Sequence, residues 1–172
     1  MKQLIFVVES DSRAKTDDRY IYKLVLYRYD LSDKDTKIQF VHMGGKNKFD
    51  DKSIRKQINN YINENRSGKN VVLYCFDTDK IDHNQTDIKT FKAEKDHCHM
   101  TNSELIWFNY DIEYVLLGKH IDSNMKLKES IKFLDKNMVR INISNLKCEN
   151  ENCCGKSNIY LILDKHLKLL KK

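Results

Sequence analysis

Two aspartates separated by one residue follow an apolar run of this chain. The run VVLYCF spans residues 71–76, and Asp77 and Asp79 come directly after it. A third carboxylate, Glu9, follows a second apolar run, QLIFVV at residues 3–8. Carboxylates that crowd together repel one another, so such a set is sustained by a divalent cation or by raised pKa values. Because oxygen ligands suit Mg²⁺, these residue types point to a site for Mg²⁺ or Mn²⁺.

The elements around these carboxylates decide whether they can meet. Short apolar runs rich in β-branched and aromatic residues predict strands over residues 3–8, 37–43, 71–76 and 103–108. Apolar residues at helical spacing predict helices over residues 17–29, 50–65, 110–118, 125–138 and 157–172, with a short one around Ile88 and Phe91. This alternation predicts an α/β fold, namely a doubly wound, mainly parallel sheet with helices on both faces and a C-terminal helical segment.

Particular residues define the expected helix ends and buried faces. Thr16 or Asp17 is the predicted N-cap of the first helix. Gly68 is the predicted C′ residue of the helix over 50–65, and Gly118 should close the helix over 110–118. The next two helices should bury the apolar residues Leu127, Ile131, Leu134, Ile159, Ile162, Leu163, Leu167 and Leu170.

The 172 residues are expected to form one domain, with an α/β core over residues 1–118 and a helical extension over residues 119–172 packed on it. No stretch has the composition of a linker, since the chain contains no proline and only five glycines. The formal net charge of +6 is compatible with a polyanionic partner, and equally with a lysine-rich solvated surface.

The N-terminal apolar run stops at Glu9, which makes it too short for a signal-peptide core or a membrane span. No other run approaches membrane length. The five cysteines are odd in number and unevenly placed, unlike a secreted disulfide framework. We therefore expect a cytoplasmic protein with no membrane-embedded part.

In a doubly wound sheet, functional groups gather at the carboxyl ends of the strands, next to the point where the strand order reverses. If the first and third strands are neighbours, as in flavodoxin-like orders, then Glu9, Asp77 and Asp79 converge on one small volume. The D-x-D spacing suits a shared site, because alternate residues of an extended segment point the same way. The simpler alternative is that CFDTD is an acidic loop at the end of a strand.

A glutamate after the first strand and a D-x-D after the third resemble the Toprim domain, which occurs in topoisomerases, primases and OLD-type nucleases. The matching segments are FVVES, with Glu9, and CFDTD, with Asp77 and Asp79. The segment ELIWFNYDIEYVLLG at residues 104–118 is similar to one in the RloB-like Toprim proteins, where Glu113 matches the acid.

This chain departs from those families in two places. Ser10 stands where many Toprim proteins have glycine, and residues 119–172 match no family that we can name.

The resemblance implies a Mg²⁺-dependent nuclease that hydrolyses phosphodiester bonds in DNA or RNA. It makes Asp77 and Asp79 metal ligands, and it makes Glu9 a ligand or a general acid–base. Glu113 would support a second metal or orient Glu9. RloB-like and OLD-like proteins are associated with bacterial antiphage defence, often beside an ATPase, so the resemblance also implies an ATPase partner.

Three cations fall in the expected rim loops and can hold phosphate, namely Arg13, Lys15 and Lys80. Solvated side chains are the alternative for each of them.

Two other kinds of protein stay open as alternatives. A receiver-like signalling module also has acids after the first strand and an aspartate after the third, although the fourth strand here ends in WFNYD rather than in the Thr or Ser of a receiver. A catalytically silent partner of another enzyme is the second alternative.

Cysteines and histidines suggest a zinc site less strongly than the acids suggest magnesium. Cys148, Cys153 and Cys154 include only one pair near metal-ligand spacing, and His97 and His99 are distant in sequence. Reduced thiols and surface histidines are the alternative. Cys75 and Trp107 lie within predicted strands, and we expect both to fill the core.

Overall fold

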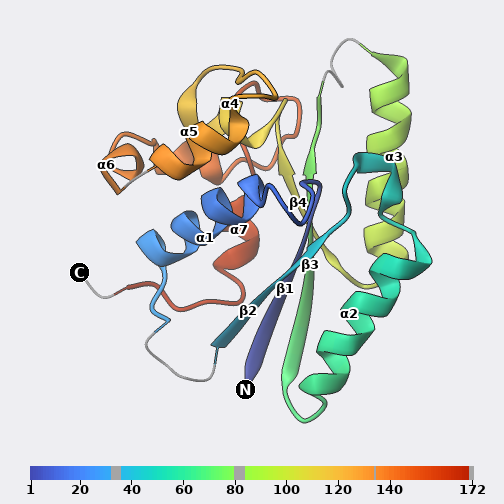
Figure 1. Cartoon of the computed structure of the whole chain (residues 1–172). Coiled ribbons are helices and arrows are strands. Elements are labelled where there is room, and N and C mark those ends of the chain that lie inside the picture. Colours follow the sequence, from blue (N-terminus) through green and yellow to red (C-terminus); the bar gives the residue numbers. More distant parts are fainter. Residues whose placement is uncertain (32–35, 80–83, 134, 171–172) are drawn as a thin grey trace.

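The computed structural model describes residues 1–31, 36–79, 84–133 and 135–170. Within them, one all-parallel sheet of four strands has the order β2-β1-β3-β4 (Figure 1). The strands are β1 Lys2–Val8, β2 Thr36–His42, β3 Lys69–Asp77 and β4 Glu104–Phe108. All four predicted strands are present, and β1 and β3 are neighbours, as a flavodoxin-like order requires.

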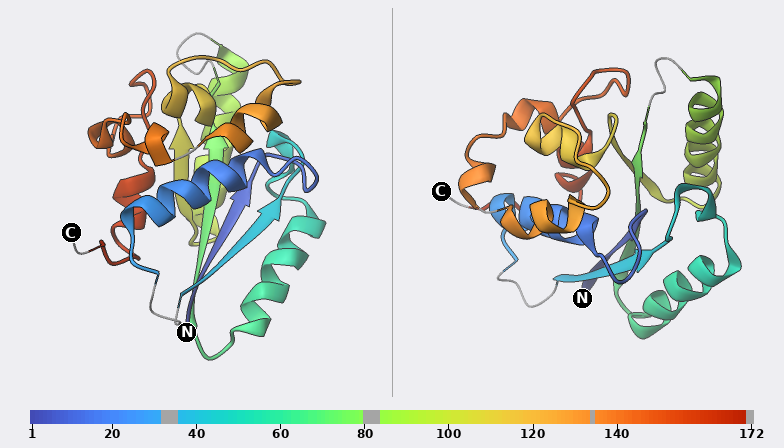
Figure 2. Two further views of the ribbon diagram at one scale, coloured as in Figure 1. Left: turned by 60° about the vertical axis from the view of Figure 1, so that its left-hand side comes forward. Right: turned by 45° about the horizontal axis from the view of Figure 1, so that its top comes forward.

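Helices cover both faces of this sheet (Figures 1 and 2). One face carries α2 and α3, and the other carries α1, α4 and the C-terminal helices. The helices are α1 Thr16–Arg28, η1 Lys46–Lys48, α2 Lys52–Glu64, α3 Gln85–Met100, α4 Ile112–Leu117, α5 Lys126–Lys132, α6 Asp135–Met138, η2 Ile143–Leu146 and α7 Ile159–Leu163. The predicted α/β class with a parallel sheet is therefore confirmed, and α3 is much longer than the short helix expected there.

The winding of the chain places a topological switch point at the centre of the sheet. From β1 the chain passes through α1 to β2 at one edge, then through α2 past β1 to β3, and through α3 to β4 at the other edge. The strand order therefore reverses between β1 and β3. The crevice outside their carboxyl ends is where sheets of this kind bind ligands.

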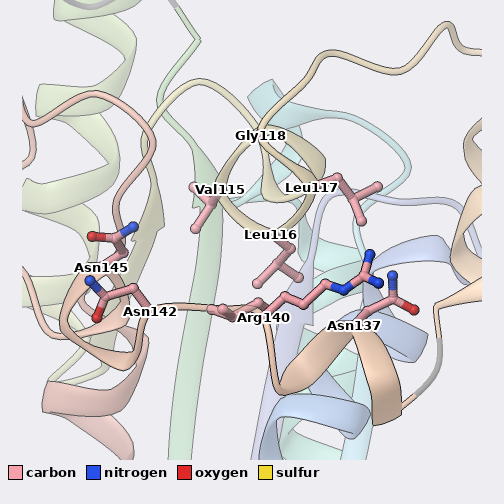
Figure 3. A pocket seen from close by; sticks show the side chains of 9 residues that line it. Val115, Leu116, Leu117, Gly118, Asn137, Arg140, Asn142 and Asn145 are labelled. Atoms are coloured by element: carbon pink, nitrogen blue, oxygen red, sulfur yellow. The ribbon is translucent and has the colours of Figure 1, made fainter.

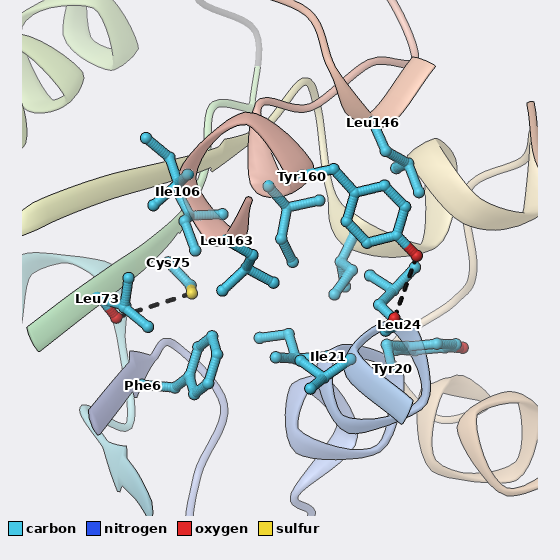
Figure 4. Packing of buried hydrophobic residues seen from close by; sticks show 14 of the residues in the cluster. Phe6, Tyr20, Ile21, Leu24, Leu73, Cys75, Ile106, Leu146, Tyr160 and Leu163 are labelled. Atoms are coloured by element: carbon cyan, nitrogen blue, oxygen red, sulfur yellow. Dashed lines mark hydrogen bonds between the residues drawn. The ribbon is translucent and has the colours of Figure 1, made fainter. Parts of the chain in front are cut away.

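Two buried layers follow from the two-residue period of the strands. In β1, Leu4 and Phe6 join the cluster under α1 and α7, whereas Ile5 and Val7 join the cluster under α2. Figure 4 shows the larger layer, where side chains of α7 and α1 pack against Phe6, Leu73, Cys75 and Ile106 of the sheet. Strands buried on both faces read as continuous apolar runs, which is why β1 and β3 were recognisable from sequence.

The C-terminal extension is anchored to the end of α1 around Asp164. Arg28 donates two hydrogen bonds to this carboxylate, from Nε at 3.1 Å and from Nη2 at 3.0 Å, and the Tyr29 hydroxyl donates a third at 2.7 Å. Lys147 also pairs with Asp164. The Tyr160 hydroxyl donates to the Leu24 carbonyl oxygen at 3.1 Å, which ties α7 to α1 (Figure 4). Residues of the extension thus share one buried layer with the sheet.

Two predicted helix ends are wrong. The N-cap of α1 is Lys15, in a left-handed conformation with φ 48°, and the Asp17 carboxylate instead accepts the backbone N–H of Ser10 at 2.9 Å. Helix α2 is capped at Asn65, so Gly68 is not its C′ residue. A Cβ at Gly68 would lie 2.1 Å from the Met1 carbonyl oxygen, so this glycine permits a close backbone approach. Gly118 does close α4 as predicted, with φ 70°.

The predicted helix over 125–138 is two short helices with a different buried face. Leu127 and Ile131 are 42% and 60% exposed, and Leu134 lies outside the described residues. Phe133 and Met138 are buried instead, and the Phe133 ring packs edge-on against Tyr20 at 5.0 Å. This contact with α1, rather than the local spacing of apolar residues, decides which side chains of the segment are buried.

The predicted helix over 157–172 ends after one short turn, at Leu163. Beyond it, the Leu170 N–H donates to the Arg28 carbonyl oxygen at 3.0 Å, and the Asp30 N–H donates to the Lys168 carbonyl oxygen at 3.0 Å. This pairing with the end of α1 takes backbone groups that a longer helix would need. Leu167 is buried as predicted, whereas Leu170 is 44% exposed.

Of the helices in the described ranges, none is both long enough and apolar enough to cross a membrane.

We expect the Asp164 anchor to weaken in acid. Burial by itself raises the pKa of Asp164, but hydrogen bonds from Arg28, Lys147 and Tyr29 lower it from 3.8 to about 2. The contribution to stability is therefore present above about pH 4 and is lost as the pH falls toward 2. Urea unfolding should show a steeper loss of unfolding free energy over this range for the wild type than for Asp164→Asn. Parallel pH profiles of the two proteins would contradict this role.

Candidate functional site

Glu9 and Asp77 are joined directly at the carboxyl edge of the two central strands. Glu9 follows β1, and its Oε1 accepts the backbone N–H of Asp77, the last residue of β3, at 2.8 Å. Burial raises the pKa of Glu9 to about 7, although this hydrogen bond and the nearby Lys46 lower it in part. The parallel pairing of β1 with β3 therefore places two of the predicted site residues in contact.

The Asp77 carboxylate turns toward α4. Its Oδ1 accepts the backbone N–H of Ile112, in the first turn of that helix, at 3.1 Å. Burial raises the pKa of Asp77 well above its usual value, and the neighbouring carboxylates of Glu9, Asp17 and Glu113 raise it further. Asp77 therefore belongs to a group of acids on the α1, α4 and α5 side of the site.

Asp79 points elsewhere, so the expectation that the two aspartates point the same way is wrong. The backbone at Asp79 is left-handed, with φ 51°, rather than extended. Its N–H donates to the Tyr110 carbonyl oxygen at 2.9 Å, and its Oδ2 accepts from Lys46 Nζ at 2.9 Å. Alternation of side chains holds only within an extended segment, and β3 ends at Asp77.

Lys46 contacts the Asp79 carboxylate and is attracted by Glu9 and Glu94, and we call these four residues the Lys46 cluster. Lys46 lies in η1, just after β2, and its Nζ also donates to the Asp77 carbonyl oxygen at 2.7 Å. Burial by itself lowers the pKa of Lys46, but the hydrogen bond with Asp79 and attraction to Glu94 and Glu9 raise it overall. The ammonium thus pairs with one carboxylate and is attracted by two others.

Glu94 is the unusual member of the Lys46 cluster. It lies on α3, its residue is 0% exposed, and neither carboxylate oxygen has a hydrogen-bond partner within the described residues. Burial raises its pKa to about 8, despite the attraction of Lys46. Leaving a buried polar group unpaired costs about 1–3 kcal/mol, and more if the group is charged. Binding of a proton or a cation to the Glu94 carboxylate would therefore lower the free energy of this arrangement.

A second group lies on the other side of Asp77, and we call it the Lys126 cluster: Asp17, Asp77 and Glu113 with Lys126. Lys126 Nζ donates to Glu113 Oε2 at 2.9 Å, and the residue Glu113 is 0% exposed. Burial by itself lowers the pKa of Lys126, but attraction to Glu113 and Asp77 raises it to about 12. Glu113 therefore lies at the candidate site, next to Asp77.

The sequence analysis did not single out Lys46, Glu94 or Lys126. Lys46 follows the Gly44-Gly45 pair after β2, a turn that could have marked it as a loop residue near the strand ends. Glu94 and Lys126 carry no such signal, since charged residues on helices are usually solvated. Only the packing of α3 and α5 against the sheet edge brings them to the acids.

The predicted phosphate-binding residues lie less close to the acids. Arg13 and Lys15 are exposed in the loop between β1 and α1, and no contact of their charged groups with the acids is present in the described structure. Lys80 lies outside the described residues.

The two clusters are rich in the oxygen donors that Mg²⁺ and Mn²⁺ prefer. Across residues 1–31, 36–79, 84–133 and 135–170, no three His, Cys, Asp or Glu side chains are arranged to hold a metal ion. In this conformation a lysine ammonium provides positive charge within each cluster. The donors in the Lys46 cluster fit a divalent cation chemically, because the Glu94 carboxylate has no other partner.

The residues considered for zinc are spread over two places. His97 is buried and its Nε2 lies 3.1 Å from the Tyr74 hydroxyl, whereas His99 is exposed on the same helix. The three cysteines lie in the loop before α7 as free thiols. Cys75 and Trp107 are buried, as predicted for core residues.

A separate pocket lies beside α4 (Figure 3). It has a volume of about 380 Å³ and is lined by residues 115–118 and by Asn137, Arg140, Ile141, Asn142 and Asn145. None of the six acids of the Lys46 and Lys126 clusters lines it, so it is distinct from the acidic site.

No protein-family model, no curated protein and no solved structure matches this chain. The Toprim resemblance of the sequence therefore stays a prediction.

We expect Glu94 to make the metal-free protein less stable as the pH rises. Its native pKa is about 8, against 4.5 for an unperturbed group, so the native state keeps a proton that the unfolded chain releases. The stabilisation is present below about pH 4.5 and is lost as the pH rises through 8. Unfolding in chelator at several pH values should show a smaller fall for Glu94→Gln than for the wild type.

The matched control for this comparison is Glu64→Gln, since the Glu64 side chain is 57% exposed at the end of α2. Its pH profile should follow that of the wild type. Equal slopes for Glu94→Gln and the wild type would show that Glu94 does not carry a raised pKa.

Proposed function

We propose that this protein is a Mg²⁺-dependent nuclease of Toprim type, which hydrolyses phosphodiester bonds in nucleic acid. The observation that carries the proposal is the Lys46 cluster, in which Glu9, Asp79 and Glu94 lie near one ammonium at the switch point of the sheet. If all three carboxyl groups were ionised they would outnumber the single ammonium, and the raised pKa values of Glu9 and Glu94 show that protons relieve this excess when no other cation is present. The buried, unpaired carboxyl group of Glu94 makes this charge imbalance hard to relieve without a proton or a further cation.

Glu9, Asp79 and Glu94 are the residues that would hold a divalent cation there. When bound, Mg²⁺ or Mn²⁺ orients a water molecule and neutralises charge on a phosphate. Lys46 would give up its contact with Asp79, and its ammonium would then be close enough to the site to bind a phosphate oxygen of the substrate. The Asp77 N–H would keep holding Glu9 in place.

The Toprim resemblance also assigns Asp77 and Glu113 to the reaction. Both belong to the Lys126 cluster, where Lys126 is the nearby cation. They would act at a second cation position or hold the first turn of α4 in place, since Asp77 accepts the Ile112 N–H. Arg13, Lys15 and Lys80 stay proposed as outer phosphate contacts.

The same resemblance suggests the setting of this activity. A nuclease of the RloB-like or OLD-like kind would act in the cytoplasm as an effector of antiphage defence, beside an ATPase partner. The net charge of +6 is compatible with a nucleic-acid substrate. DNA and RNA both remain candidates for that substrate.

The receiver-like alternative finds less support in the geometry. A phosphoacceptor aspartate needs a free carboxylate, whereas Asp77 is partly buried and its Oδ1 accepts the Ile112 N–H. Receivers also carry a lysine after a fifth strand, and the sheet in the described residues has four strands. A catalytically silent module is the alternative that the following test addresses.

Titration calorimetry with Mn²⁺ tests the cation site directly. We expect the wild type to bind Mn²⁺, and we expect Asp79→Asn/Glu94→Gln to bind it at least about tenfold more weakly, because the change removes two anionic donors. Glu64→Gln, whose exposed carboxylate pairs with Lys37, is the matched control and should bind as the wild type does. Equal binding by the double variant and the wild type would contradict the site.

Cleavage of end-labelled DNA and RNA in Mg²⁺ or Mn²⁺ tests the activity itself. The wild type and Glu64→Gln should cleave, and Asp79→Asn/Glu94→Gln should not. Mn²⁺ binding without cleavage, also in the presence of a candidate ATPase, would favour a silent module over a nuclease.

A further inference from the structure

Three aromatic rings form a compact group beside the Lys46 cluster. They belong to Tyr110, just after β4, to Tyr114 on α4, and to His120, just after α4. The ring centroids of Tyr114 and His120 are 4.6 Å apart with an interplanar angle of 19°, so these two rings are stacked. Tyr110 meets both of them edge-on, at 5.2 Å and 5.5 Å. We call this group the aromatic platform.

His120 is exposed, whereas Tyr110 and Tyr114 are partly buried. Gly155 lies against the Tyr114 ring, since a Cβ built on it would be 3.5 Å from Tyr114 Cε1. His120 lies stacked on the Tyr114 ring, and the His120 side chain is 61% exposed. His120 is therefore the ring of this group that a ligand from solution can reach most readily.

The rings are held in place before any ligand arrives. Asp111 links them, because its Oδ1 accepts the Tyr114 N–H at 2.6 Å and its Oδ2 lies 3.2 Å from His120 Nδ1. The Cys154 thiol also contacts the Tyr114 hydroxyl at 3.5 Å. A platform that is already ordered loses little conformational entropy when a ligand stacks on it.

The aromatic platform is tied to the D-x-D loop by two hydrogen bonds of the Tyr110 backbone. Tyr110 N–H donates to Thr78 Oγ1 at 3.1 Å, and the Tyr110 carbonyl oxygen accepts the Asp79 N–H at 2.9 Å. The backbone at Tyr110 is left-handed, with φ 67°, a strained conformation for a tyrosine. Such strain clusters at functional sites. Here the strained residue, Tyr110, is bonded to Asp79, which in turn contacts Lys46.

One exposed lysine is the neighbour of His120 in the sequence. Lys119 is exposed and directly precedes His120, and within the described part of the chain it has no ion pair. Aromatic faces interleaved with cations are the combination that binds single-stranded nucleic acid, whose bases stack on rings while its phosphates meet lysines. Bases within a duplex are already stacked on their neighbours and do not offer a free face.

We propose that His120, backed by Tyr114, is a stacking platform for one base of a single-stranded nucleic acid whose backbone passes over Asp79. This inference rests on the proposed function, because it makes the substrate of the acidic site a single strand. It names His120 as a substrate-binding residue and Asp111 as the positioning residue that holds it.

The test measures binding in chelator, so that it depends on neither the cation nor cleavage. Single-stranded DNA and RNA oligonucleotides with one 2-aminopurine are titrated with the protein, since stacking on a ring quenches this base. The wild type should bind and quench. His120→Ala should bind about tenfold more weakly and lose the quenching, and His120→Phe should retain both, because it keeps a ring.

Two controls make the outcome specific. Tyr22→Ala removes a tyrosine that is 44% exposed on α1, and it should behave as the wild type does. The duplex form of the same oligonucleotide should bind more weakly and without quenching. The affinity and quenching measured for the DNA oligonucleotide, compared with those for the RNA oligonucleotide, show which of the two the protein prefers.

Three outcomes would overturn the stacking proposal. They are no binding of either single strand, equal binding and quenching by His120→Ala and the wild type, and duplex binding as tight as single-strand binding. None of them depends on metal, so the loss of the cation site in calorimetry would refute the proposed function separately.

Discussion

The parallel pairing of β1 with β3 is the constraint on which the candidate site depends. The chain winds in opposite directions from these two strands, so no helix connects them directly, and the carboxyl ends at such a switch point are where sheets of this kind bind ligands. The pairing sets Glu9 level with the end of β3, where it accepts the Asp77 N–H. Every other group of the site comes from a segment that leaves or covers this edge: the segment after β3, η1, α1, α3, α4 and α5.

Carboxyl groups outnumber lysines at that edge of the sheet. Six acids gather in two clusters, and each cluster holds one lysine, which leaves both with more carboxylates than cations. Raised pKa values at Glu9, Asp77 and Glu94 are the electrostatic consequence of burial and crowding. Proteins sustain such an arrangement when a cation, a proton or a substrate relieves it, which is why the acidic edge, rather than the pocket beside α4, is the candidate site.

The apolar pattern made much of the fold predictable. The strands, the α/β class and the end of α4 at Gly118 follow from short apolar runs and one glycine, whereas the neighbouring positions of β1 and β3 were only a condition that the structure meets. The C-terminal helices were not predictable in detail. Phe133 packs on Tyr20, and the segment after Leu163 pairs with the end of α1, so long-range contacts decide which apolar residues are buried there.

The sequence by itself determined that Glu9, Asp77 and Asp79 lie at or just after the ends of strands, because the apolar runs that form these strands stop at polar residues. Only the tertiary structure decided which way they point, since the left-handed backbone of Asp79 turns its carboxylate to Lys46 and away from that of Asp77. It also brought Glu94 from α3 to the acids. A helical glutamate looks like a solvated residue in a sequence, and its burial depends on which face of the helix meets the sheet, which local spacing does not encode.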